Sequence, residues 1–175
     1  MPTGIEPPEI HLLGAGEESA SAAAALGIGY AYAHHFAPDG AALALRRYRA
    51  EFRPSAFRAA PHAIVAVAAI CAETDADAEE LARSGELSWL RFGQGQRDLP
   101  LPSVDEARAY VLDAEEEELR RAGRTRSIRG SVETVGRALR ALVAESRADE
   151  VMVTTAIHDH AERKRSYERL LNALS

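Results

Sequence analysis

The residues whose types and spacing could do chemistry begin with three small ones, Gly14-Ala15-Gly16, followed closely by Ser19. They stand between a short apolar stretch and an alanine-rich one, which is the pattern of a strand, a tight turn and a helix. Free N–H groups and the dipole at a helix start both attract negative charge, and small residues let a ligand approach the backbone. The segment is therefore either an anion site or a close-packed strand-to-helix turn that binds nothing.

A second group, His34-His35-Phe36, stands where the next strand, residues 30–33, is expected to end. Barrel enzymes place their active-site groups at the carboxyl ends of parallel strands, so these three side chains are candidates for a pocket. The alternative is an interior histidine that hydrogen-bonds to a neighbouring strand end. The sequence leaves both interpretations open.

Other reactive residue types form no recognisable constellation. His158-Asp159-His160 has the residue types of metal ligands but no further Cys or His nearby, so we expect no metal site. Cys71 lies inside an apolar strand, and no Ser/His/Asp or Cys/His arrangement stands out, so covalent catalysis is not expected. The sequence alone therefore names no catalytic residue.

The elements that must position these groups alternate between strand and helix. Helical patterns follow each strand, and the unit after the third strand is enlarged, spanning residues 75–123. Such alternation predicts parallel βα units, and four of them make half of an eight-stranded (β/α)8 (TIM) barrel; an open doubly wound sheet is the alternative. The expected strands are residues 9–13, 30–33, 62–72 and 149–155; the expected helices are 18–26, 38–52, 75–90, 104–122, 130–145 and 159–174.

Composition narrows the class of protein further. The 175 residues predict a single domain, with a proline-spaced linker at residues 1–8. A net charge of −6 argues against a general nucleic-acid binder. The single cysteine excludes a disulfide framework and fits a reducing cytoplasm, and no apolar run reaches the length of a membrane span.

The stretch LLGAGEESASAAAALGIGYAYAHHFAP resembles the middle of the bacterial-luciferase-like, flavin-dependent monooxygenases, whose members typically read LLGSSxxSAxLAAxLGLPYAFAxHF. The resemblance continues in the family's order over nearly the whole chain. Its further segments are RRYRAEFRPS from Arg46, AVAAICAETDADAEELA from Ala66, IRGSVETVGRALRAL from Ile128, DEVMVTT from Asp149, and RKRSYERLL from Arg163.

The resemblance implies a barrel enzyme that binds reduced FMN, of which this chain is the C-terminal half. The barrel would be completed by self-association, as a homodimer, or by a separate N-terminal half. The family's small-hydroxyl turn holds the FMN phosphate, and the matching residues are Gly14, Ala15, Gly16 and Ser19. Ala15 and Gly16 stand where the family has paired serines, so backbone amides and Ser19 remain. His35-Phe36 match the family's HF pair, which places His34, His35 and Phe36 near the substrate or the flavin ring.

The implied function is oxidation of a small organic substrate with O2 and reduced flavin, the latter supplied by a flavin reductase. Two alternatives come with the resemblance. One is a relative that uses the deazaflavin coenzyme F420, whose phosphate-linked tail also needs an anion site. The other is a non-catalytic remnant or assembly subunit of such a barrel. The sequence does not identify the substrate.

Overall fold

The computed structural model of the protein describes residues 8–174. The linker expected at residues 1–8 lies outside that range except for Pro8, which is exposed and belongs to no helix or strand. The described chain forms two compact units. Unit 1 comprises residues up to Ala66 together with Val143–Met152, and unit 2 comprises Val67–Leu142 with the chain from Val153 onward.

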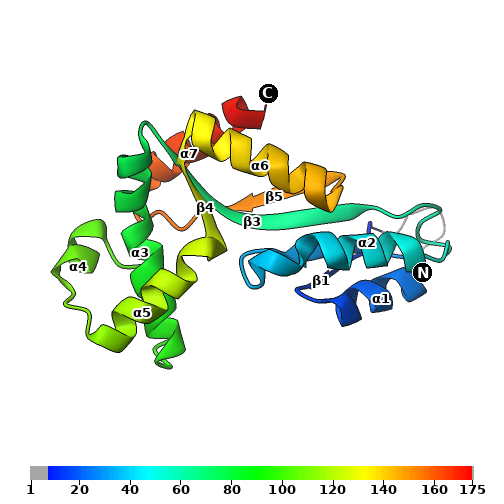
Figure 1. The fold of residues 1–175 in the computed structure, drawn as a ribbon, viewed down its shortest axis with the longest axis horizontal. Coiled ribbons are helices and arrows are strands. Elements are labelled where there is room, and N and C mark those ends of the chain that lie inside the picture. The colour runs from blue at the N-terminus through cyan, green and yellow to red at the C-terminus, as the bar shows by residue number, and fades with distance from the viewer. Residues whose placement is uncertain (1–7, 175) are drawn as a thin grey trace. The chain divides into compact units, whose positions relative to one another are not determined.

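Unit 1 is built from parallel βα units, as the alternation predicts (Figure 1). Strand β1 pairs in parallel with β2 from His11↔Gly29 to Gly14↔Tyr32, and β2 pairs with the start of β3 from Tyr30↔Ala63 to Ala33↔Ala66. Its elements are β1 (His11–Gly14), α1 (Glu17–Leu26), β2 (Gly29–Ala33), the 3-10 turn η1 (Pro38–Gly40), α2 (Ala41–Glu51) and the first residues of β3 (Ala63–Ala72).

Three fully buried tyrosines form the centre of unit 1. Tyr30 and Tyr32 of β2 alternate with alanines, so both rings point to the face that α1 and α2 cover. The ring of Tyr48, from α2, lies 5.6 Å from that of Tyr30, and its hydroxyl donates to Ile28 O at 2.8 Å. Burying these rings holds the two helices on the sheet, because each phenol is large and each finds a polar partner.

Unit 2 contains the rest of β3 and the enlarged helical region after it. Strand β4 extends the sheet beside β3, in parallel register from Ala68↔Ser127 to Ala72↔Ser131, and β5 also pairs with β3. Its elements are α3 (Asp75–Gly93), α4 (Val104–Ala109), α5 (Ala114–Ala122), the 3-10 turn η2 (Gly123–Arg126), β4 (Ser127–Ser131), α6 (Val132–Ser146), β5 (Glu150–Thr154) and α7 (His160–Leu174), with parts of α6 and β5 in unit 1.

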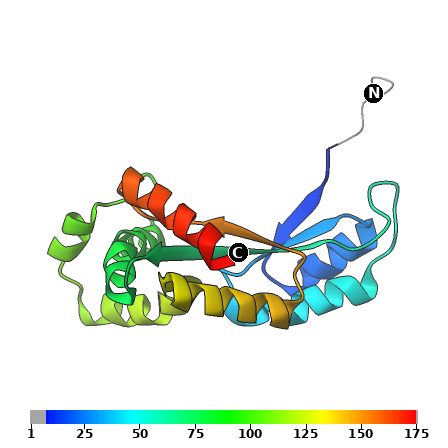
Figure 2. The same cartoon turned by 90° about the horizontal axis from the view of Figure 1, so that it is seen from above.

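Helix α7 packs on both β3 and α6 (Figure 2). The Cys71 amide of β3 donates to the Ser166 hydroxyl at 2.9 Å. Arg140 of α6 donates to Ala173 O at 2.8 Å, close to where Gly136 lets the α7 backbone approach. Within residues 8–174, no helix is both long and apolar enough to cross a membrane.

Most element boundaries predicted from local signals are confirmed. Helix α1 ends at Gly27, whose φ of +63° is left-handed, as a helix-terminating glycine requires. Thr74 caps α3 by accepting from Asp77 N at 3.1 Å, and Ser103 caps α4 by accepting from Glu106 N at 3.1 Å. These signals are reliable because a cap involves only residues that are adjacent in sequence.

Two helix predictions between residues 104 and 145 are wrong. The single helix expected over residues 104–122 is two helices, because Asp113 starts a new one with a reciprocal capping box to Glu116. The helix expected to open at Gly130-Ser131 begins only at Val132, since residues 127–131 form strand β4. Gly130 has a φ of +156°, and a Cβ there would lie 2.7 Å from Asp75 Oδ1. A helix cannot include that backbone conformation, so strand β4 takes its place.

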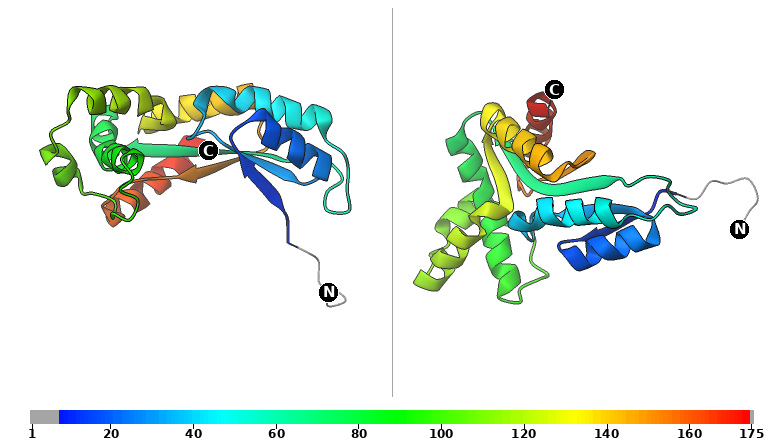
Figure 3. Two further views of the ribbon diagram at one scale, coloured as in Figure 1. Left: turned by 90° about the horizontal axis from the view of Figure 1, so that it is seen from below. Right: turned by 45° about the vertical axis from the view of Figure 1, so that its right-hand side comes forward.

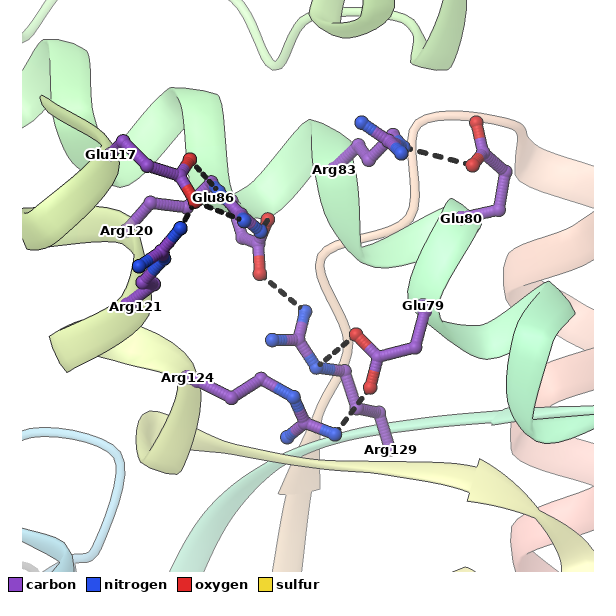
Figure 4. A network of polar contacts seen from close by, with 9 residues as sticks. All are labelled: Glu79, Glu80, Arg83, Glu86, Glu117, Arg120, Arg121, Arg124 and Arg129. Carbon is purple, nitrogen blue, oxygen red and sulfur yellow. Dashed lines mark hydrogen bonds and ion pairs between the residues drawn. The ribbon is translucent and has the colours of Figure 1, made fainter. Parts of the chain in front are cut away.

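Arg124 and Arg129, which lie close together in the sequence, belong to an ion-pair network within unit 2 (Figure 4). Arg129 of β4 is buried, with Nε 3.2 Å from Glu79 and Nη1 2.6 Å from Glu86, both on α3. Each carboxylate also meets a second arginine, Glu79 contacting Arg124 and Glu86 lying 3.2 Å from Arg120. A buried guanidinium requires such counter-charges, so Arg129 fastens β4 to α3.

Candidate functional site

The turn between β1 and α1 ends at Gly16, the residue that precedes the helix. Its backbone is extended, with φ −162° and ψ 173°, and no side chain caps the start of α1. A Cβ built on Gly16 meets nothing within 4 Å, so the space beside the first helical turn is open. Open space beside an uncapped helix start is the environment in which backbone N–H groups bind an anion.

Gly14 has a different role from Gly16. A Cβ on Gly14 would lie 2.1 Å from Ser19 Oγ and 2.4 Å from Ser19 Cβ, so any larger residue there would displace Ser19. Gly14 therefore lets the serine of α1 pack against the end of β1. Of the predicted phosphate residues, Gly14 and Ser19 are in direct proximity, while Ala15 is exposed and Gly16 borders open space.

The Ser19 hydroxyl belongs to a three-membered polar group. Ser19 Oγ lies 2.8 Å from Gly16 O and 2.9 Å from Tyr30 Oη, and Tyr30 Oη lies 3.0 Å from Gly16 O. Burial raises the pKa of Tyr30, so its phenol stays protonated and neutral. The Ser19 and Tyr30 hydroxyls both donate to Gly16 O. To donate to a ligand, Ser19 would therefore give up its hydrogen bond to Gly16 O, which Tyr30 would continue to make.

One of the two glutamates at the helix mouth is neutralised within unit 1. Glu17 Oε2 lies 3.0 Å from Arg47 Nη1, and the same arginine reaches Glu51 through Nε at 2.9 Å. Glu18 is exposed. The ion pair draws the negative charge of Glu17 toward α2, which lowers the electrostatic penalty for an anion at the start of α1.

His34, His35 and Phe36 follow β2 and lie together at its carboxyl end. The His34 side chain is only 8% exposed, and its Nδ1 has no hydrogen-bond partner among the described residues. Burial, with a smaller contribution from His35, lowers the pKa of His34, so the imidazole is neutral near neutral pH. His35 Nδ1 lies 3.3 Å from Ala66 O, and its ring packs 4.7 Å from that of Phe36.

The sheet register brings the turn and the histidines to one edge. Gly14 pairs with Tyr32, which stands two residues before His34 in the neighbouring parallel strand. The loop after the histidines is held by Tyr32, whose hydroxyl donates to Ala37 O at 2.7 Å. Both predicted groups thus lie at the carboxyl ends of adjacent strands, where barrel enzymes bind their ligands.

Tyr30 is the site residue that sequence reasoning did not identify. The GYAYA pattern indicates a strand, and both tyrosines read as core residues. A buried phenol also needs a hydrogen-bond partner, and for Tyr30 that partner is the turn itself. The alternation of tyrosine with alanine was therefore the available signal.

The remaining reactive residues have structural roles. Asp159 caps α7 by accepting from Glu162 N at 2.8 Å, and His160 Nδ1 lies 2.9 Å from Arg163. Within the described chain, no three His, Cys, Asp or Glu side chains are arranged to hold a metal ion. Burial raises the pKa of the Cys71 thiol, which keeps it protonated.

Comparison with known proteins places this geometry in context. The family model for the luciferase-like monooxygenases matches residues 1–171. The chain is 42% identical over 163 residues to Uncharacterized protein YceB of Bacillus subtilis, covering 93% of this chain and 49% of YceB. It is 34% identical over 159 residues to the luciferase-like monooxygenase of Escherichia coli K12, covering 91% of this chain and 47% of that protein.

Solved structures give the same picture. Apo-MsnO8 superposes with a TM-score of 0.84 at 36% identity, covering 98% of this chain and 52% of MsnO8. The oxygenating constituent of 3,6-diketocamphane monooxygenase from Pseudomonas putida, in complex with FMN, shares the fold with a TM-score of 0.52 at 20% identity, covering 99% of this chain and 49% of that one.

The chain spans about half the length of the curated relatives that it matches. The expected fold of parallel βα units is confirmed, and it corresponds to half of a luciferase-like barrel. With the family model matching almost every residue, the chain belongs to the luciferase-like monooxygenase family.

Proposed function

We propose that this chain supplies the phosphate-binding turn and one wall of the substrate pocket of an FMN-dependent monooxygenase, which oxidises a small organic substrate with O2. The observation that carries the proposal is the uncapped start of α1, with open space at Gly16, at the same sheet edge as His34. The FMN bound to the diketocamphane enzyme, which shares this fold, supports the choice of cofactor.

The residues of the turn fit a phosphate through the backbone more than through side chains. The amides at the start of α1 and the Ser19 hydroxyl would hold it, with Gly16 leaving the approach open. Two serine hydroxyls of the family pattern are replaced by Ala15 and Gly16. Each hydrogen bond to a charged group contributes about 1.5–3 kcal/mol, so we expect weaker FMN binding than the serine pattern would give.

When bound, reduced FMN supplies the electrons that activate O2, and the protein supplies binding, orientation and exclusion of water. In this chain the neutral His34 offers a hydrogen-bonding nitrogen at Nδ1 without placing a charge beside the flavin ring. The His35–Phe36 pair contributes an apolar surface at the same strand end. A flavin reductase would deliver the reduced cofactor, and the deazaflavin coenzyme F420 is the alternative that the same anion site would accept.

We further propose that activity requires a second half of the barrel, either a separate N-terminal half or another copy of this chain. The support is the match to only about half of each relative's length. A non-catalytic assembly subunit is the second candidate function, and the replacement of the paired serines by Ala15 and Gly16 favours it.

The test is a fluorescence titration of FMN against three proteins: the native chain, the Ala15→Ser/Gly16→Ser variant, and Ser19→Glu. We expect the double serine variant to bind FMN at least about tenfold more tightly, because two charge-assisted donors return. Ser19→Glu should bind at least about tenfold more weakly, because it adds a carboxylate beside the phosphate.

Absorbance spectra of the same samples distinguish bound FMN from F420. The turn would have only a packing role, and bind no phosphate, if all three proteins bound FMN with equal affinity. The same conclusion would follow if even the serine variant, supplied with a first barrel half, bound no FMN. The non-catalytic assembly subunit would then be the better description.

A further inference from the structure

Unit 2 carries an exposed cluster of aromatic rings and arginines at the end of α3. Trp89 and Phe92 pack edge to face with ring centroids 5.8 Å apart, yet remain 38% and 48% exposed. The Arg126 guanidinium lies 4.9 Å from the centre of the Trp89 ring, and that of Arg97 lies 5.1 Å from the Phe92 ring. We call these four residues the aromatic–arginine patch. Trp and Arg are the residue types that contribute most to protein interfaces.

The guanidinium groups of the patch are already oriented. Stacking on an aromatic face restricts each guanidinium group and leaves its N–H groups available for hydrogen bonds. Within residues 8–174, neither Arg97 nor Arg126 forms an ion pair, in contrast to Arg120, Arg124 and Arg129 of the same unit. The patch therefore presents two positive charges and two aromatic rings to solvent.

The outward face of α5 has the opposite character. Glu115, Glu118 and Leu119 are spaced three and four residues apart, so they share one side of the helix, and all three are exposed. Val111, just before α5, is 89% exposed. We call these four residues the acidic–aliphatic face. Neither Glu115 nor Glu118 forms an ion pair with any described residue.

The opposite side of α5 is the one that holds the helix on unit 2. Helix α5 runs beside α3 in unit 2 (Figure 3). Glu116 accepts hydrogen bonds from Tyr110 at 2.7 Å and from Gln94 at 2.6 Å, and Arg120 lies 3.2 Å from Glu86 of α3. Hydrogen bonds from Arg120 and Arg121 lower the pKa of Glu117 to about 2, so it remains charged. The acidic–aliphatic face is thus directed away from α3 by contacts that occupy the inner side.

We propose that two copies of this chain associate through these two surfaces, the aromatic–arginine patch of each copy contacting the acidic–aliphatic face of the other. Two carboxylates match two guanidinium groups, and Val111 and Leu119 match the exposed parts of Trp89 and Phe92. Both surfaces belong to one compact unit, and η2 connects α5 directly to Arg126, so their spacing is fixed within each copy. Two such contacts related by a two-fold axis close a dimer.

A second copy is the occupant favoured by charge. The chain has a net charge of −6, so two copies repel each other in general and associate only where a positive surface meets a negative one. Here the chain itself carries both surfaces. The association involves none of the residues of the flavin proposal, so either proposal can fail without the other.

The chain contains a built-in reporter, because Trp89 is its one tryptophan. Covering the exposed part of this ring shifts its emission to shorter wavelength and protects it from quenching by iodide. We expect both changes as the concentration rises through the dimerisation range, in parallel with the mass measured by sedimentation equilibrium. Association through a different surface would raise the mass and leave Trp89 open to the quencher.

Charge reversal supplies the decisive experiment. Arg97→Glu/Arg126→Glu makes both surfaces negative, and Glu115→Arg/Glu118→Arg makes both positive. Each variant alone should dimerise at least about tenfold more weakly than the native chain, because like charges then face each other. Mixed in equal amounts, the two variants should form a heterodimer in which every contact again joins opposite charges. Recovery on mixing also shows that neither variant has lost its fold.

Matched controls reverse the same number of exposed charges elsewhere: Arg46→Glu/Arg53→Glu in unit 1, and Glu145→Arg/Glu168→Arg. These controls should leave the dissociation constant of the dimer within about twofold of the native value, apart from the general effect of net charge. The proposal is overturned if the native chain sediments as a monomer up to about 100 µM, a concentration at which even a weak dimer would form. It is also overturned if the reversed variants still dimerise alone, or if mixing restores nothing.

Discussion

Two glycines two residues apart have different physical roles in the β1–α1 turn. At Gly14 the missing side chain makes room for Ser19, which closes the polar group with Tyr30 and Gly16 O. At Gly16 the missing side chain leaves open space beside the helix start. Only the first is needed for packing, and only the second offers room to a ligand.

This difference predicts opposite outcomes for two substitutions. Gly14→Ala places a methyl group where Ser19 now lies, and we expect it to lower the free energy of unfolding by about 1–3 kcal/mol, as overpacking does. Gly16→Ser meets no atom within 4 Å, so the free energy of unfolding should stay within about 0.5 kcal/mol of the native value. Urea unfolding measures both. Equal stabilities for the two variants would contradict the assignment of Gly14 as a packing residue.

At the scale of elements, the helices of unit 2 are joined by polar side chains at their ends. Asp75, in the first turn of α3, accepts from Ser131 N at 2.7 Å and from the Thr134 hydroxyl at 3.2 Å. One carboxylate thus connects the start of α3 with the end of β4 and the first turn of α6. The hydrogen bond from Ser131 N, followed by that from Thr134, lowers the pKa of Asp75 below its ordinary value of 3.8.

A lowered pKa predicts how stability depends on pH. The carboxylate is favoured in the folded state, so its contribution is fully present above pH 3.8 and is lost as the pH falls through the folded pKa. Asp75→Asn should therefore be less stable than the native protein at pH 5, and the difference should shrink toward pH 2.5. Urea midpoints at the two pH values test this, with Asp98→Asn, an exposed site, as the control. A difference that stays constant with pH would refute the linkage.

At the scale of the whole molecule, the chain spans about half the length of the luciferase-like relatives that it matches. Leu13 of β1 and Met152 of β5 are large apolar side chains of strands, and both are exposed. Strands with exposed apolar side chains are surfaces that soluble proteins usually cover. In the proposed enzyme, the other half of the barrel would cover them.

Supplying that half is a direct test. Co-expressed with the N-terminal half of the E. coli luciferase-like monooxygenase, this chain should co-purify as a complex and bind FMN at least about tenfold more tightly than alone, because a completed pocket needs less ordering on binding. Leu13→Asp should prevent the complex, since it places a charge at the sheet, whereas Leu26→Asp, exposed on α1, should not. If the complex forms equally well with Leu13→Asp, the N-terminal half does not cover β1.

Local signals determined most of the architecture from sequence alone. The buried run at residues 63–72, the glycine after α1 and the caps Thr74 and Ser103 each act within a few residues, so they are visible without coordinates. Short-range signals of the same kind also identified the β1–α1 turn and the histidines after β2 as candidate site residues. The family resemblance then supplied what periodicity could not, the half-barrel organisation.

Only the tertiary structure decided features that depend on partners distant in sequence. Residues 127–131 form a strand because β3 offers a parallel edge and Asp75 approaches Gly130. Arg129 is buried because two glutamates of α3 neutralise it, whereas the sequence shows only that it lies close to Arg124 and Arg126. Tyr30 joins the turn because its strand lies beside β1. Burial of a charge or a hydroxyl is decided by what packs against it, and a single sequence does not record those contacts.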